Sequence, residues 1–116
     1  MWQIETTTQW ERDQKHYQKK HPDALAAILR NLERFLSLLN LSKNSKCVMA
    51  GFLHHEPHGV VAVDQKGFRG NVPETRLYTL PVDKTQTLYL ITIGDKNSQH
   101  SDVEFSRRFA GSFDKA

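Results

Sequence analysis

The most regular pattern of apolar residues along the chain lies between Pro22 and Leu39. Leucine, isoleucine and phenylalanine recur there every three or four residues, which is the spacing of an amphipathic helix. Pro22 and Asp23 suit its first turn, because proline loses no hydrogen bond there and an acidic side chain favours the positive end of the helix dipole. The pattern therefore predicts a helix that packs one face on a core.

Three other segments flank the strands of the predicted fold. Residues 2–7 alternate apolar and polar side chains, which predicts a short strand with one buried face. Residues 9–20 are almost wholly polar, so they predict a solvated helix that touches the core through Trp10 and Tyr17. Residues 98–112 predict a final helix. Its apolar positions are Val103, Phe105, Phe109 and Phe113.

Between the second and third predicted helices the period changes to that of strands. Apolar runs at 48–53 and 59–63 predict two strands joined by the turn HHEPH at 54–58. Residues 65–73 contain two glycines and a proline and predict a loop. The order of elements predicts an α+β fold in which a strand and two helices precede an antiparallel sheet and a helix ends the chain, with the helices on one face.

A β-hairpin is predicted in the second half of the chain. Residues 75–82 and 85–93 face each other across Asp83-Lys84. Residues 88–93 are nearly continuously apolar, which is typical of an inner strand covered on both faces.

Composition restricts the class of protein. The chain has 116 residues and is 38% hydrophobic, which predicts one domain spanning 1–116. It contains no apolar run of about 20 residues, no secretory signal pattern and one cysteine, so a soluble cytoplasmic protein without an internal disulfide is expected. Lys and Arg number 16 against 13 Asp and Glu, an excess that permits a polyanionic partner but does not require one.

Polar residues gather near the predicted strand ends. If the segments that carry them fold together, they form one cleft. These residues are His54, His55, Glu56, His58, Lys66, Arg69, Arg76, Tyr78, Lys96 and His100.

Two of these groups have alternative interpretations. The HHEPH segment is either a solvated turn or the source of an acid or base, which would be a histidine or Glu56. A metal site is less favoured, because Pro57 disfavours a helix and a strand sends His54 and His55 to opposite faces. Arg76 and Tyr78 share one face of a strand. Arg76 is then either a solvated edge arginine or a guanidinium that binds phosphate.

The order of elements and the segment RLYTLPVDKTQTLYLITIGDKNSQHSDVEF resemble the RelE/ParE superfamily of toxins from toxin–antitoxin systems. In that family a strand with an R-x-Y pattern pairs with an apolar strand that ends in glycine and a basic residue, and an HSD-like segment closes the cleft. Arg76-Leu77-Tyr78, Leu88–Ile93, Gly94-Asp95-Lys96 and His100-Ser101-Asp102 occupy these places.

The resemblance implies a cytoplasmic endoribonuclease that cleaves messenger RNA, on the ribosome or off it, without a metal or cofactor. A ribose 2′-hydroxyl would attack the adjoining phosphate, which requires a base, a cation and an acid. The resemblance assigns phosphate stabilisation to Arg76 and Lys96, acid or base chemistry to His100, and RNA binding to Lys66, Arg69 and Tyr78. Glu56 and His55 are candidate bases from their chemistry alone, and no motif of the family assigns this role to either of them.

The same resemblance carries other expectations. An antitoxin protein would be the partner, and their complex would bind operator DNA. Members of the superfamily divide by target, so a gyrase-binding inhibitor without catalytic residues is the alternative, as is an inactive RelE-like binding protein.

Overall fold

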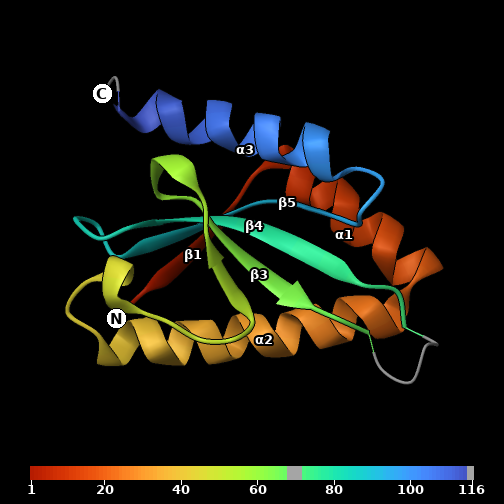
Figure 1. The fold of residues 1–116 in the computed structure, drawn as a ribbon, viewed down its shortest axis with the longest axis horizontal. Coiled ribbons are helices and arrows are strands. Elements are labelled where there is room, and N and C mark those ends of the chain that lie inside the picture. The colour runs from red at the N-terminus through yellow and green to blue at the C-terminus, as the bar shows by residue number, and fades with distance from the viewer. Residues whose placement is uncertain (68–71, 115–116) are drawn as a thin grey trace.

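The chain folds as a five-stranded mixed sheet between helices (Figure 1); the computed structural model describes residues 1–67 and 72–114. The elements in chain order are β1 (Gln3–Thr6), α1 (Thr8–Lys20), α2 (Pro22–Leu41), the 3-10 turn η1 (Ser45–Cys47), β2 (Leu53–His55), the 3-10 turn η2 (Pro57–Gly59), β3 (Val61–Gln65), β4 (Thr75–Val82), β5 (Thr87–Gly94) and α3 (Gln99–Asp114). This bears out the α+β class and the predicted order of the main elements.

The sheet has the strand order β1-β5-β4-β3-β2, and its first pair is parallel. β1 runs beside β5 from the pair Gln3 and Thr87 to the pair Thr6 and Leu90, whereas the other neighbouring strands are antiparallel. The prediction of an antiparallel sheet is therefore wrong for β1. The hairpin places β4 on one side of β5, and the outer edge of β5 accepts the N-terminal strand.

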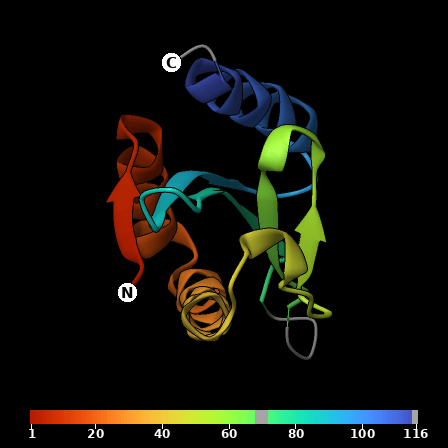
Figure 2. The same ribbon diagram turned by 90° about the vertical axis from the view of Figure 1, so that its left-hand side faces the viewer.

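Helices cover both faces of the sheet, so the prediction that they share one face is wrong (Figure 2). α1 and α2 pack on one face, where Phe35 and Ile28 are fully buried with Leu77 and Leu88. α3 packs on the other face through Ala110, in a smaller core. β4 and β5 are apolar on both sides, and each side must be removed from water.

The two N-terminal helices begin where their sequences indicate. The side chain of Thr7 accepts a hydrogen bond from the backbone N–H of Trp10 and caps α1. Pro22 opens α2 in the first turn, where its missing N–H has no helical acceptor. Trp10 and Tyr17 are the buried residues of α1, as predicted.

The strands at the two edges differ from the prediction. All four residues of the edge strand β1 are exposed, including Ile4, so the prediction that this strand has a buried face is wrong. Residues 48–52 form no strand; instead β2 starts at Leu53 and includes both histidines of the predicted turn. The apolar residues 48–52 instead connect η1 to β2, and Val48 packs in the core without pairing to a strand.

The β4–β5 hairpin forms as predicted, and β5 lies inside the sheet between β1 and β4. Its register changes between Tyr78, which faces Thr92, and Thr79, which faces Leu90, so Ile91 bulges toward the α3 side. α3 follows β5 after a short turn. Among the described helices, none is long and apolar enough to cross a membrane.

Candidate functional site

Two adjoining cavities lie between α3 and the sheet, and Tyr78 lines both. The larger, here called the Arg76 cleft, has a volume of about 100 Å³. It is lined by Asp64, Gln65, Lys66, Glu74, Thr75, Arg76, Tyr78, Asp95, Lys96 and Gln99. The smaller, of about 30 Å³, lies under η2 and α3. It is lined by Glu56, Pro57, Val60, Tyr78, Val103, Ser106 and Arg107.

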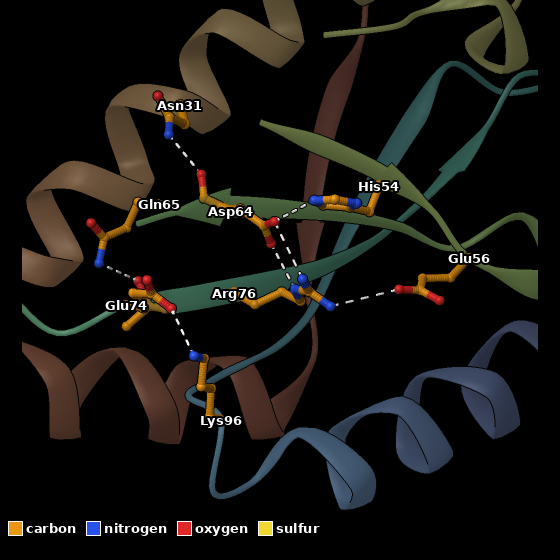
Figure 3. Close-up of polar contacts among 9 residues, drawn as sticks. Asn31, His54, Glu56, Asp64, Gln65, Glu74, Arg76 and Lys96 are labelled. Carbon is orange, nitrogen blue, oxygen red and sulfur yellow. Dashed lines mark hydrogen bonds and ion pairs between the residues drawn. The ribbon is translucent and has the colours of Figure 1, made fainter. Parts of the chain in front are cut away.

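A polar network at the cleft joins β2, β3 and β4 (Figure 3). The Arg76 guanidinium donates from Nε to Asp64 Oδ1 at 2.6 Å and from Nη2 to Asp64 Oδ2 at 3.3 Å. Its Nη1 lies 3.8 Å from Glu56 Oε1. His54 Nε2 lies 2.6 Å from Asp64 Oδ2, so Asp64 holds both a histidine and an arginine.

Strand register places these side chains on one face. Asp64 is directly opposite Arg76 in the β3–β4 ladder, and His54 is opposite Ala62 in the β2–β3 ladder. Residues two apart on a strand point the same way, so His54, Asp64 and Arg76 all face α3. A cross-strand pair of opposite charge also favours this register.

The end of β3 is fastened from the other side of the sheet. Asn31 of α2 donates from Nδ2 to the backbone oxygen of Asp64 at 2.7 Å. Gln65 donates to the Thr75 hydroxyl at 3.0 Å and accepts from the backbone N–H of Gly67 at 2.8 Å. These bonds fix the backbone that carries Asp64.

The position of Glu56 depends on the tight connection between β2 and β3. Its backbone N–H donates to Val60 O at 2.8 Å, and His58 and Gly59 adopt positive φ values of 65° and 82°. Glycine accepts this conformation without strain, which lets the chain reverse within η2. Glu56 thereby faces the open side of the Arg76 guanidinium.

Burial and charge act in opposite directions on Arg76. Burial lowers the pKa of Arg76, but the hydrogen bonds and negative charge of Asp64 outweigh this effect and raise it above its ordinary value. Burial also raises the pKa of Tyr78, against the influence of the neighbouring Arg76 charge. Arg76 therefore stays charged and Tyr78 stays protonated at neutral pH.

Charges around the Arg76 cleft cancel. Its lining contains the cations Lys66, Arg76 and Lys96 and the carboxylates Asp64, Glu74 and Asp95. Lys96 lies 3.6 Å from Glu74, but both side chains are exposed, so the pair is weak. A phosphate entering the cleft would compete with these carboxylates for the cations.

Most residues predicted from the sequence meet here. Arg76, Lys96, Lys66 and Tyr78 line the Arg76 cleft, and Glu56 lines the adjoining cavity. Among the described residues, His100 is exposed on the first turn of α3 and lines neither cavity. Arg69 lies outside the described residues.

The segment after β5 packs closely on its last residue. Asp102 accepts a hydrogen bond from the Ser98 hydroxyl at 2.7 Å, and both side chains lie against Gly94. A Cβ on Gly94 would overlap them, so the absence of a side chain there allows α3 to begin close to the sheet.

The sequence pattern assigns no separate role to His54 and does not point to Asp64. A turn was expected at His54, whereas β2 carries it to the α3 side and sends His55 to the other side, where His55 Nε2 lies 2.8 Å from Val48 O. Asp64 follows Val63 at the end of an apolar strand, and only the register with β4 brings it opposite Arg76. Within the described residues, no group of three or more His, Cys, Asp or Glu is placed to hold a metal ion.

No protein-family model matches this chain, and no curated protein is similar to it in sequence.

Proposed function

We propose that this protein is an endoribonuclease toxin of the RelE/ParE type, which cleaves messenger RNA and is countered by an antitoxin protein. The position of Arg76 in the cleft carries the proposal, together with its contact to Glu56 and the link through Asp64 to His54, which lines neither cavity. It is supported by the R-x-Y strand β4, which pairs with the apolar strand β5 so that Arg76 lies opposite Gly94. The C-terminal helix that follows agrees with the same resemblance.

The network contains each group that the reaction requires. The Glu56 carboxylate takes the proton of the ribose 2′-hydroxyl, whose oxygen forms a bond to the adjoining phosphorus. Arg76 uses Nη1, the guanidinium nitrogen that Asp64 does not occupy, to stabilise the added negative charge on the phosphate oxygens. The bond from phosphorus to the 5′-oxygen breaks, and the protonated His54 gives that oxygen a proton. The products are a 2′,3′-cyclic phosphate and a 5′-hydroxyl end.

Asp64 is the positioning residue of this arrangement. Its side chain is 8% exposed and bonds both to Arg76 and to His54, so it fixes their separation. His54 is 48% exposed and can reach an RNA strand. Lys66 and Lys96, at the rim of the cleft, bind flanking phosphates, and Tyr78 forms its floor.

Growth and transcript ends in bacteria test the proposal. Induction of the wild type should arrest growth and create new messenger RNA 5′ ends, whereas Glu56→Gln and Arg76→Ala should lower cleavage at least 100-fold. Arg34→Ala, an exposed arginine on α2 across the sheet, is the charge-matched control and should act like the wild type. Intact transcripts during arrest would refute nuclease chemistry, and full cleavage by both site variants would refute the catalytic roles of Glu56 and Arg76.

The acid is identified by a second pair of variants. His54→Asn should reduce cleavage and His100→Asn should leave it close to the wild-type rate, because only His54 touches the network. The neighbouring His55→Asn controls for loss of a histidine in β2. A defect confined to His100→Asn would assign the acid to α3 instead.

A gyrase-binding inhibitor is the second candidate. Two observations favour it: the Arg76 guanidinium is already paired with Asp64, and the cleft is lined by equal numbers of cations and carboxylates. A nuclease must overcome both when it binds a phosphate. Purified protein that inhibits gyrase supercoiling and leaves RNA intact would establish this alternative.

A further inference from the structure

A larger cavity lies between α1, the end of β5 and the start of α3, and it shares Asp95 with the Arg76 cleft. Its volume is about 540 Å³. The side chains that matter for its chemistry are Asp13, Tyr17, Asp95, Ser98 and Asp102, and we name this cavity the acidic groove.

The carboxylates of the acidic groove are held rigidly by the chain itself. Asp13 Oδ2 accepts from the Thr92 hydroxyl at 2.6 Å and from the backbone N–H of Ile93 at 3.0 Å. Asp102 Oδ2 accepts from the Ser98 hydroxyl, and Asp95 Oδ1 accepts from the backbone of the turn before α3. These bonds orient the carboxylates and leave Asp102 Oδ1 and Asp95 Oδ2 without a hydrogen bond from the described residues.

The positive charges of the groove lie at its rim. His16 and Arg108 also line it, and both side chains are exposed. Exposed cations are hydrated and screened by salt, so they offset the inner carboxylates weakly.

Tyr17 supplies an independent sign of a ligand. Its residue is 8% exposed and lines the groove, yet its hydroxyl has no hydrogen bond to any described residue. Burial raises the pKa of Tyr17 to about 12, with the negative charges of Asp95, Asp102 and Asp13 adding to the effect. The hydroxyl oxygen stays accessible to solvent although the rest of the Tyr17 side chain is buried, so it is free to bond to an occupant of the groove.

We infer that the acidic groove binds an organic cation, a guanidinium or ammonium group, through Asp102, Asp95 and the Tyr17 hydroxyl. Such a group donates several N–H bonds to carboxylate and phenol oxygens. The groove is far larger than a metal ion needs, and the described residues contain no cluster of three His, Cys, Asp or Glu placed for one. The carboxylates also repel phosphate, which makes this groove chemically unlike the surface proposed to bind RNA.

NMR titration of the full chain tests this inference. N-acetyl-arginine amide should shift the backbone resonances of Gly94, Asp95 and Ser101 in a saturable way, and the neutral isostere N-acetyl-citrulline amide should not. Spermidine forms a second arm: tighter binding of spermidine would indicate a free polyamine, and tighter binding of the arginine amide would indicate a side chain of a partner protein. Equal shifts with citrulline, or no saturable shift with either cation, would overturn the inference.

Variants separate the groove from general charge attraction. Asp102→Asn and Tyr17→Phe should each weaken binding at least fivefold, whereas Glu11→Gln, on the exposed side of α1, removes one negative charge and should change it less than twofold. Tyr17→Phe removes a single oxygen and decides the matter if Asp102→Asn does not fold. Unchanged affinity in Tyr17→Phe together with full binding by a folded Asp102→Asn protein would contradict the assignment. RNA cleavage plays no part in this readout.

Discussion

At the scale of single residues, Asp64 has the greatest influence on the candidate site. It is nearly buried and bonds to Arg76 and His54 at once, so its loss leaves a partly buried guanidinium without its partner. A buried acidic residue at the end of an apolar strand is unusual unless it is paired. Asp64 therefore serves stability and geometry together.

Asp64→Asn should destabilise the fold measurably. Breaking a fully buried ion pair costs roughly 3–5 kcal/mol, and because Arg76 is 27% exposed we expect about 2 kcal/mol here. Urea denaturation followed by circular dichroism measures this change. Arg34→Ala serves as the surface control, and a change below about 0.5 kcal/mol in Asp64→Asn would show that the pair does not stabilise the chain.

Tyr17 gives a pH-dependent prediction. Its pKa of about 12 in the folded state lies above the ordinary value of 10.0, so the folded chain keeps this proton longer than the unfolded chain does. The associated stability is fully present below pH 10 and is lost as the pH rises toward 12. Tyr17→Phe should have a flatter stability curve above pH 10. A Tyr17 ¹³Cζ resonance that titrates near pH 10 would contradict the burial and charge effects described above.

At the scale of elements, the junction between β5 and α3 couples the sheet to its second layer. Asp102 and Ser98 fill the space beside Gly94, where a side chain would overlap them. The same two residues help define the acidic groove. A change at this junction therefore affects both packing and the groove.

Gly94→Ala should shift the start of α3. The added methyl group displaces the Asp102 carboxylate from Ser98, at an expected cost of about 1–3 kcal/mol. Asp102→Ala in the same chain opens that space and should recover part of the loss, which thermal unfolding of the two single variants and the double variant measures. If the changes in stability of the two single variants simply add up in the double variant, the added methyl group does not contact Asp102.

Helical elements could be predicted from the sequence more reliably than strand partners. The spacing of Ile28, Leu32 and Phe35 is a local signal, and α2 forms with these residues buried. The parallel pairing of β1 with β5, and the register that places Asp64 opposite Arg76, depend on contacts between distant segments of the chain. Local periodicity contains no information on that pairing, so it does not indicate that His54 and Asp64 meet Arg76.

The residues near the cleft show the same limit. Arg76, Tyr78 and Lys96 were predictable because a hairpin and the residue after it are adjacent in sequence. His100 follows by only a few residues, but the turn of α3 on which it lies places it outside both cavities. Successive side chains on a helix point about 100° apart, so His100 points away from the cleft that the preceding residue, Gln99, lines.

At the scale of the whole molecule, the placement of charge matters more than its total. The net charge of +3 is small, and the cations that line the Arg76 cleft do not line the acidic groove, although Asp95 lines both. RNA binding should therefore depend on Lys66 and Lys96 rather than on the overall excess of basic residues.

Substitution of both lysines should weaken RNA binding and its response to salt. Removing one lysine–phosphate interaction with a single strand lowers the slope of log K against log salt by about 0.7, so Lys66→Ala with Lys96→Ala should lower it by about 1.4. Fluorescence anisotropy with a short RNA measures both quantities. The double control Arg30→Ala with Arg34→Ala, on α2, should leave the slope unchanged, and an equal decrease in both proteins would indicate non-specific attraction.

A cleavage assay with two substrates decides between a nuclease and a binding protein. One substrate is a defined RNA, and the other is the same RNA with 2′-deoxyribose at the cleaved position. Purified protein is added to each substrate, free and on programmed ribosomes, and the ends are identified by mass spectrometry. The proposed reaction predicts a 2′,3′-cyclic phosphate and a 5′-hydroxyl from the RNA and no cut in the deoxy substrate. It also predicts that Glu56→Gln forms neither product. Cleavage of the deoxy substrate at the same position, or an uncut RNA in every arrangement, would contradict the proposed reaction.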